Sequence, residues 1–142
     1  MKDEMSKPRV VVLGAGLLHA EHYRRIRQMG CMTIAVDRDP DAPARGEADV
    51  FCRSDPSQTD AVLDVAARHK ADAIIPLAEF GVVPAAEASE CLGLSHVRMS
   101  AALATHDKAM FRQALARAGV DQPGFAIVSS LAAAKQAADR LG

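Results

Sequence analysis

The stretch RVVVLGAG, residues 9–16, decides the fold class of this 142-residue chain. The apolar run from Val10 to Leu13 is typical of a strand that is buried on both faces of a parallel sheet. The Gly14-Ala15-Gly16 turn that follows brings backbone N–H groups to the start of a helix, where α/β proteins bind ligands. The segment therefore predicts a first strand–helix unit with a ligand-binding turn.

Strands and helices continue to alternate along the chain. Apolar runs predict further strands over residues 32–36, 48–52 and 73–76. Helices are predicted between them, the first over residues 17–29 with Leu18, Ile26 and Met29 on one side, and another opened by Asp55-Pro56. This order predicts an α/β fold with a doubly wound parallel sheet, in which the strand of residues 9–13 is flanked by those at 32 and 73.

The C-terminal segment is predicted to be a short strand–helix extension that is added to the sheet domain and is not part of its sheet. Phe125 to Val128 predict a strand, and a helix follows up to Leu141. We therefore expect a polar tail over residues 1–8, a main domain over 9–119 and the extension over 120–142. An isolated strand–helix pair cannot cover both of its faces, so we expect the extension either to be mobile or to dock on a second copy as a homodimer.

Composition excludes several classes of partner. A net charge of −1, from 17 basic and 18 acidic residues, provides no field toward nucleic acid or an anionic membrane. No stretch approaches the roughly 20 apolar residues of a membrane span. The three cysteines are far apart and suggest neither a disulfide framework nor a zinc site. We expect a cytoplasmic protein that binds small molecules.

The histidines and the glycine turn leave alternatives open. His19 and His22 could share one ion on a helix, but no third ligand is evident, and we expect no metal site. A dinucleotide-binding turn needs a small residue where His19 stands, although Asp37 ends the second strand where a ribose-binding acid would lie. A nicotinamide-binding oxidoreductase domain and a non-catalytic interaction module therefore remain alternative hypotheses.

Two other charged residues stand at positions where ligands bind. Glu79 follows the buried strand of residues 73–76, at the sheet edge where α/β proteins bind substrates; it could equally be a helix N-terminal acid stabilised by the helix dipole. Lys108 opens a helix beside Asp107, which is an unusual place for a cation. It could neutralise a bound phosphate, or it could be a surface lysine paired with Asp107.

The ordered motifs resemble the start of the ATP-grasp carboxylate–amine ligases. They are VVVLGAG, AVDRDPDAPA, the acid after AIIP, and DKAMFRQALARAGVDQP followed by GFAIVSSLAAAKQAADRLG. The resemblance covers residues 9–142, and the DPDAPA loop and the DK helix are its most specific parts. Within the superfamily the chain is similar to formate-dependent glycinamide ribonucleotide transformylases and, over AEFGVVPAAEASECLGL, to ligases that join amino acids into dipeptides.

The resemblance implies a Rossmann-like pre-ATP-grasp domain over residues 9–119, on the substrate side of a ligase. It also implies that residues 120–142 are the first strand and helix of a truncated ATP-grasp domain. Such a ligase uses ATP and Mg²⁺ to activate a carboxylate as an acyl phosphate and joins it to an amine. The resemblance implies that Lys108 reaches ATP phosphates. It also assigns a set of residues to the acceptor substrate: Gly14, Gly16, Leu17, Leu18 and Glu79.

Two departures from the family pattern qualify this expectation. The transformylases have a Glu-Leu pair where Leu17-Leu18 stands, which favours a different acceptor. The second ATP-binding lysine, the Gly-rich lid and the Mg²⁺-binding carboxylates of the family are not found in the 142 residues. We therefore expect a truncated fragment with no catalytic residue, no activity alone and no tightly bound cofactor.

Overall fold

The computed structural model describes residues 7–142. The chain divides into two compact units, the first ending at Ala102 and the second comprising Leu103–Gly142. The first unit is an α/β domain, and the second is helical. Across the described residues, no helix is both long and apolar enough to cross a lipid bilayer.

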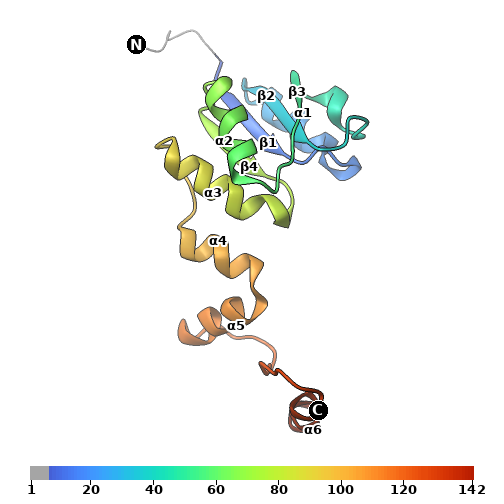
Figure 1. The fold of residues 1–142 in the computed structure, drawn as a ribbon, viewed down its shortest axis with the longest axis vertical. Helices are drawn as coiled ribbons and strands as arrows, with labels where there is room; N and C mark the ends of the chain where they lie inside the picture. The colour runs from blue at the N-terminus through green and yellow to red at the C-terminus, as the bar shows by residue number, and fades with distance from the viewer. Residues whose placement is uncertain (1–6) are drawn as a thin grey trace. The chain divides into compact units, whose positions relative to one another are not determined.

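The first unit is built on a four-stranded parallel sheet. Its strands are β1 (Arg9–Leu13), β2 (Met32–Asp37), β3 (Val50–Arg53) and β4 (Ala73–Pro76). Their order is β3-β2-β1-β4, so β1 lies between β2 and β4 as predicted (Figure 1). Val11 pairs with Ile34 on one side and Ile74 on the other, and it is fully buried. The α/β fold and the parallel sheet predicted from the sequence are confirmed.

Alternate residues of β1 face opposite layers, which makes the sheet doubly wound. Val10 and Val12 face a core that includes Tyr23 of α1 (Ala20–Gln28). Val11 and Leu13 face the other core, built with residues of α2 (Thr59–Arg68) and α3 (Val82–Cys91). Residues that alternate between two covered faces leave no side of the strand to water, which explains the unbroken apolar run.

The buried face of α1 differs from the one predicted. Leu18 and Met29 were expected beside Ile26, but their exposed fractions are 86% and 74%. Leu17–His19 form a 3-10 turn, η1, before the α-helix begins. The tighter turn changes the phase of the helix, and the buried side chain of α1 is Tyr23. Ala20 and Ile26, three residues to either side of it, pack against the same core.

The start of α2 also differs from the prediction. Asp55 was expected to cap this helix, but the helix begins at Thr59 with Gln58 at the capping position. Asp55 instead accepts hydrogen bonds from Ser57, through the backbone N–H at 2.9 Å and the hydroxyl at 2.7 Å. Such a local side-chain turn competes with helix formation. The residues between β3 and α2 therefore form a loop at the carboxyl end of the sheet.

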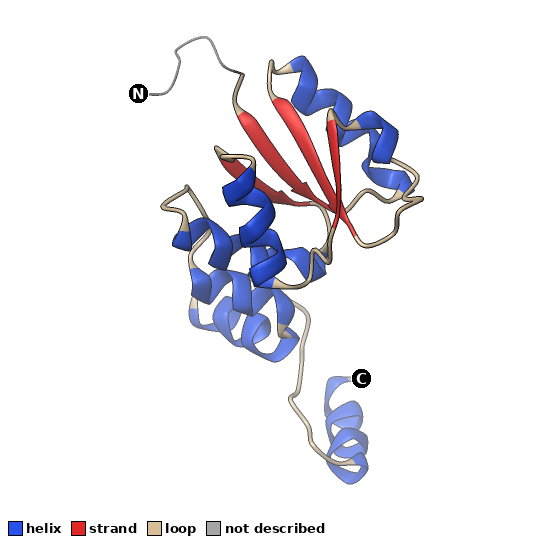
Figure 2. Cartoon of the chain, turned by 45° about the horizontal axis from the view of Figure 1, so that its top comes forward, coloured by secondary structure: helices blue, strands red, loops and turns tan. Residues whose placement is uncertain are grey.

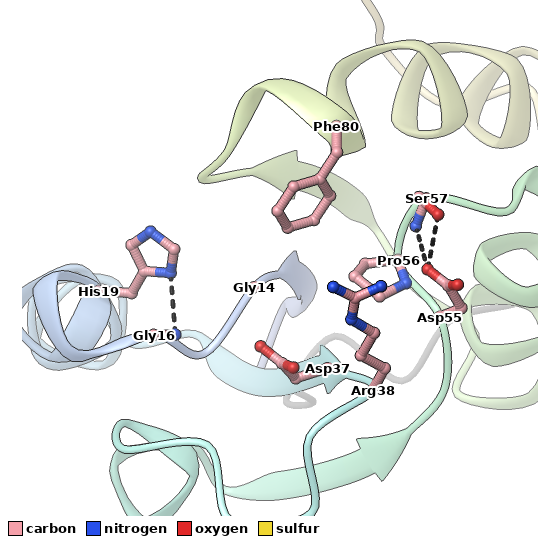
Figure 3. Close-up of a pocket in the computed structure, with 9 residues that line it drawn as sticks. All are labelled: Gly14, Gly16, His19, Asp37, Arg38, Asp55, Pro56, Ser57 and Phe80. Atoms are coloured by element: carbon pink, nitrogen blue, oxygen red, sulfur yellow. Dashed lines mark hydrogen bonds between the residues drawn. The ribbon is translucent and has the colours of Figure 1, made fainter.

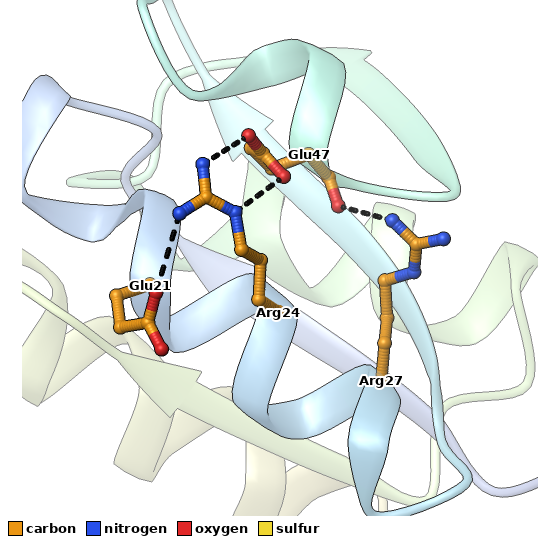
Figure 4. A network of polar contacts seen from close by, with 4 residues as sticks. All are labelled: Glu21, Arg24, Arg27 and Glu47. Atoms are coloured by element: carbon orange, nitrogen blue, oxygen red, sulfur yellow. Dashed lines mark hydrogen bonds and ion pairs between the residues drawn. The ribbon is translucent and has the colours of Figure 1, made fainter.

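A surface network ties α1 to the short 3-10 turn η2 (Arg45–Glu47) (Figure 4). Arg24 contacts both carboxylate oxygens of Glu47, at 2.6 and 3.1 Å, and also Glu21 at 3.2 Å. The hydrogen bonds from Arg24 hold the pKa of Glu47 below its ordinary value. Because these groups are exposed to solvent, the network orients the loop and contributes little to stability.

The second unit contains α5 (Lys108–Arg117) and α6 (Leu131–Leu141); α4 (Met99–His106) spans the boundary. Asp107 caps α5 by accepting from the backbone N–H groups of Ala109 and Met110, and Ser130 caps α6. The strand predicted over residues 125–128 is not formed. A strand needs a hydrogen-bonded neighbour, and the described sheet contains only β1 to β4.

Removing residues 121–142 should leave the main domain folded. The apolar side chains of this tail are poorly covered, with exposed fractions of 55% for Ile127, 74% for Leu131 and 50% for Leu141. We expect the truncated chain to keep a cooperative urea transition, because both cores of the sheet lie within residues 10–94. If the complete chain forms a dimer through its tail, light scattering should show that the truncated chain is a monomer. Loss of the cooperative transition would place the domain boundary beyond residue 119.

Candidate functional site

A cavity of about 410 Å³ lies at the carboxyl ends of the four strands (Figure 3). β1 leads into α1 on one face of the sheet, whereas β4 leads into α3 on the other. Neighbouring strands whose connections leave in opposite directions open a gap where α/β proteins bind ligands. Loops after all four strands line this switch-point cavity: Gly14, Gly16, His19, Asp37, Arg38, Asp55, Pro56, Ser57 and Phe80.

The glycine turn forms one wall of the cavity and is fixed by hydrogen bonds on every peptide. Gly14 donates to the carbonyl of Val36 at 2.9 Å, and its own carbonyl accepts from the Tyr23 hydroxyl at 2.8 Å. Gly14 has φ +102°, and a Cβ there would lie 3.1 Å from the His19 ring. The turn therefore requires glycine at this position.

Two further contacts occupy the remaining N–H groups of the turn. Ala15 donates to Oδ2 of Asp37 at 2.7 Å, and Gly16 donates to Nδ1 of His19 at 3.2 Å. The carbonyl of Ala15 accepts from Ala44, which lies in the loop that includes the DPDAPA motif, at 2.8 Å. The N–H groups of residues 14–16 thus bond within the protein, so the turn shapes the cavity and does not present these donors to a phosphate.

Asp37 connects the turn to the loop that follows β2. Its Oδ2 accepts from Ala15 and its Oδ1 accepts from the backbone N–H of Asp39 at 2.9 Å. A carboxylate that accepts backbone N–H groups forms stronger hydrogen bonds than a neutral acceptor does. Asp37 therefore fixes the position of the glycine turn relative to the loop after β2.

Arg38 and Asp55 bring opposite charges to the cavity from the loops after β2 and β3. Figure 3 shows the Arg38 side chain extending toward the loop of Asp55 and Ser57. The hydrogen bonds from Ser57, together with the attraction of Arg38, hold the pKa of Asp55 below its ordinary value. Asp55 is therefore ionised at neutral pH.

Phe80 and Pro56 supply the apolar part of the wall. Phe80 belongs to the 3-10 turn η3 (Glu79–Gly81) that follows β4. A Cβ on Gly81 would lie 3.2 Å from the Leu13 side chain, so this turn packs closely against the end of β1. The tight packing holds the Phe80 ring near Gly14, where a Cβ would lie 3.8 Å from it.

Tyr23 supports the glycine turn from the core and offers a spectroscopic test. It is the only tyrosine, and the chain has no tryptophan. Burial, and secondarily the negative charge of Asp37, raise the pKa of its phenol well above the ordinary value. We therefore expect the phenol to remain protonated in the folded domain beyond pH about 10, where an exposed tyrosine ionises.

The raised pKa links alkaline pH to stability. The contribution of the Tyr23 phenol to the free energy of unfolding should be fully present below pH about 10. It should decline as the pH rises further, because the phenol then loses its proton readily only in the unfolded chain. Ultraviolet titration of tyrosinate alongside circular dichroism checks this, with Tyr23→Phe as the control without a titrating phenol. Tyrosinate formed near pH 10 with an unchanged fold would contradict it.

The cavity brings together some of the residues predicted to bind substrate. Gly14 and Gly16 line it, whereas Leu17 and Leu18, with exposed fractions of 75% and 86%, are not among its lining residues. Glu79 begins η3 and is exposed, and the lining residue of that turn is its neighbour Phe80. The substrate-binding role of these residues stays a prediction.

Lys108 belongs to the second unit. It is the first residue of α5, and its ammonium group lies 3.4 Å from the carbonyl oxygen of Thr105. Its contact with ATP phosphates stays a prediction.

Sequence reasoning did not assign several cavity residues to the site. Arg38, Asp55, Ser57 and Phe80 were not singled out as ligand contacts, and Asp37 was considered only as a ribose-binding acid. Their signal was their position, because each follows directly or closely after a predicted parallel strand. The carboxyl ends of parallel strands meet at one edge of the sheet, so all four such loops were candidates.

His19 of η1 and His22 of α1 form no metal centre with other side chains in the described part of the chain. His19 and His22 lie edge to face with ring centroids 6.2 Å apart. Within residues 7–142, no group of three or more His, Cys, Asp and Glu side chains is arranged to hold a metal ion.

The sequence is similar to those of known enzymes. The chain is 34% identical over 135 residues to the formate-dependent phosphoribosylglycinamide formyltransferase of Synechococcus sp. (strain CC9605). The match covers 94% of this chain and 34% of that enzyme. The chain is related to the ATP-grasp enzymes. It spans about a third of the length of the relatives that it matches.

Solved structures of ATP-grasp enzymes share the fold. Glycinamide-RNase-transformylase T from Mycobacterium tuberculosis superposes with a TM-score of 0.78 at 26% identity, over 92% of this chain and 38% of that one. N5-carboxyaminoimidazole synthetase from Staphylococcus aureus, solved with ADP, gives 0.77 at 19% identity, over 94% of this chain and 36% of that one.

An L-amino acid ligase from Bacillus licheniformis has the same fold, with a TM-score of 0.71 at 16% identity over 89% of this chain and 34% of that one. No family model matches the chain. The resemblance to ATP-grasp enzymes seen in the sequence motifs is confirmed.

Proposed function

We propose that this chain is the acceptor-binding part of an ATP-dependent ligase. In the parent enzyme a carboxylate is activated as an acyl phosphate and joined to an amine, and the switch-point cavity holds the amine-bearing acceptor. The chain alone carries out no complete reaction. Its partners are small molecules.

The observation that carries the proposal is the switch-point cavity, in a chain matched over 94% of its length to a named enzyme. That enzyme is named for formate, a carboxylate, and for phosphoribosylglycinamide. A cavity of about 410 Å³ with a few polar groups and an apolar wall has the size and character of a small-molecule site. In the parent enzyme this cavity would hold the second substrate, the acceptor.

The residues of the chain position the acceptor in this proposal. The glycine turn and Asp37 fix the shape of one wall, and Phe80 and Pro56 offer an apolar surface on the other. ATP and Mg²⁺ supply the phosphoryl chemistry when bound to the rest of the parent enzyme. Lys108 is proposed as this chain's contribution to the ATP phosphates.

The acceptor differs from that of the transformylases in our proposal. Leu17 and Leu18 stand where those enzymes carry a Glu-Leu pair, and both leucines are exposed on η1. A leucine side chain, unlike a carboxylate, cannot accept hydrogen bonds that hydroxyl or amine groups of a substrate donate. We therefore expect phosphoribosylglycinamide itself to bind poorly.

The hypothesis of a nicotinamide-binding domain finds less support. A pyrophosphate binds to unoccupied N–H groups of a glycine turn, and here Gly14, Ala15 and Gly16 donate to Val36, Asp37 and His19. The carboxylate of Asp37 is likewise engaged with the turn. No specific contact favours an interaction module.

Calorimetric titration of the complete chain separates these hypotheses. We expect saturable binding of at least one compound from a panel of small primary amines, and no saturable binding of NADH. MgATP should bind weakly, since in this proposal ATP and Mg²⁺ are held by the rest of the parent enzyme. Saturable micromolar binding of NADH would contradict the proposal and support the oxidoreductase hypothesis.

A further inference from the structure

The switch-point cavity has three charged side chains, and they differ in how they are engaged. Asp37 uses both carboxylate oxygens for backbone N–H groups. Asp55 accepts both hydrogen bonds of Ser57 on the single oxygen Oδ1. Among residues 7–142, neither Oδ2 of Asp55 nor the guanidinium of Arg38 has a described hydrogen-bond or ion-pair partner.

Arg38 is positioned for a ligand by its backbone. It lies between Asp37, whose carboxylate is fixed by Ala15, and Asp39, whose N–H donates to Asp37. Its guanidinium is close enough to Asp55 to lower the pKa of that carboxyl, yet Asp55 is held by Ser57. The planar guanidinium has five N–H donors and matches a carboxylate or phosphate in a two-bond contact.

We propose that Arg38 binds the anionic group of the acceptor, a carboxylate or a phosphate. This inference rests on the proposed function and extends it to a specificity-determining residue. The apolar body of the acceptor packs against Phe80 and Pro56, and Oδ2 of Asp55 accepts from an ammonium or hydroxyl group of the same molecule. The substrate class is a small amine that carries one anionic group and an apolar or planar portion.

The charge balance of the cavity supports a ligand of mixed charge. Two carboxylates and one guanidinium give a net charge of −1 when His19 is neutral. A ligand with only negative groups would meet repulsion from Asp37 and Asp55, whereas one with an anion and a donor satisfies both Arg38 and Asp55. The cavity thus favours a ligand whose anionic group meets Arg38 and whose hydrogen-bond donor meets Asp55.

The test uses the ¹⁵N-labelled complete chain and a set of probes built on one aromatic ring. Phenylacetate and phenyl phosphate carry the two anionic groups, phenylalanine carries an anion and an ammonium, and phenylacetamide is the neutral control. We expect the anionic probes to shift the amide signals of Gly14, Gly16, Ser57 and Phe80. The anionic group preferred by Arg38 is read from the ratio of the two dissociation constants, and phenylalanine should bind more tightly than phenylacetate.

Arg38→Gln should weaken binding of the anionic probes at least about tenfold, because a charged two-bond contact is lost. Arg38→Lys should retain part of the affinity. Arg25→Gln is the matched control, since Arg25 lies on the exposed surface of α1 and does not line the cavity. Phenylacetamide should bind weakly and equally to all four proteins.

Three outcomes would overturn the role of Arg38: anions that bind wild type and Arg38→Gln equally, signals that shift outside the cavity, or no binding of any anion. The first leaves the cavity as the acceptor site, so the proposed function survives it. Unchanged binding of primary amines in the calorimetric panel likewise separates a failure of Arg38 from a failure of the proposed function.

Discussion

Leu13→Ala should destabilise the first unit by about 2–5 kcal/mol, which is the range for a fully buried leucine. Leu13 is completely buried at the end of β1, in the core built with residues of α2 and α3. Gly81 packs against it so closely that a Cβ there would lie 3.2 Å from the Leu13 side chain. The Leu13→Ala substitution therefore leaves a void beneath η3 and also removes apolar surface from the core.

Urea unfolding followed by circular dichroism measures this change. Leu17→Ala is the matched control, because the same side chain four residues later is 75% exposed. Its effect should stay within about 0.5 kcal/mol, as for other exposed positions. Equal losses for the two variants would mean that β1 does not end in the core described for it.

Asp37→Ala should destabilise the first unit by about 1.5–3 kcal/mol, because the half-buried hydrogen bond from Ala15 to a charged acceptor is lost, while the exposed bond from Asp39 adds little. The N–H groups of Ala15 and Asp39 would each lose their partner. The glycine turn and the loop after β2 would then move independently, so ligand binding in the cavity should weaken beyond what stability alone explains.

Asp39→Ala provides the control for this effect. Oδ1 of Asp39 accepts from the backbone N–H of Asp41 at 2.9 Å, but this contact is exposed and lies outside the cavity lining. Its removal should cost less than about 1 kcal/mol. If the two aspartate variants unfold at the same urea concentration, Asp37 does not hold the turn.

The sheet was predictable because its pattern is strong and local. The unbroken run of Val10 to Leu13 is typical of a strand covered on both faces, and the short runs near Met32 and Ala73 fit the same sheet. Glycines at the ends of the predicted helices also marked their limits, as Gly30, Gly93 and Gly119 all have positive φ.

The missed features depend on contacts that a local pattern does not contain. The 3-10 turn before α1 changed the helix phase and left Leu18 exposed. Because Asp55 accepts hydrogen bonds from Ser57, α2 begins at Thr59 and not at the predicted Pro56. The strand expected over residues 125–128 had suitable residues but no partner strand.

The position of the candidate cavity could be predicted from the sequence, but only some of its lining residues could. Gly14 and Gly16 line the cavity because a turn after a buried strand must lie at the carboxyl edge of the sheet. Arg38 and Phe80 were not assigned, since their roles depend on which loops converge. That convergence follows from the strand order β3-β2-β1-β4, which the sequence implies only once the crossovers are assigned.

The most direct test of the account is ADP release by a fusion that joins Gly142 to the part of the Synechococcus transformylase beyond the matched region. The fusion is assayed with MgATP, formate and the panel of primary amines, beside the unmodified transformylase with its own substrate. The account predicts ADP release that requires both formate and an amine, and that falls when Asp37 is replaced by Ala. ADP release that no amine stimulates, in a fusion that still binds ATP, would contradict it.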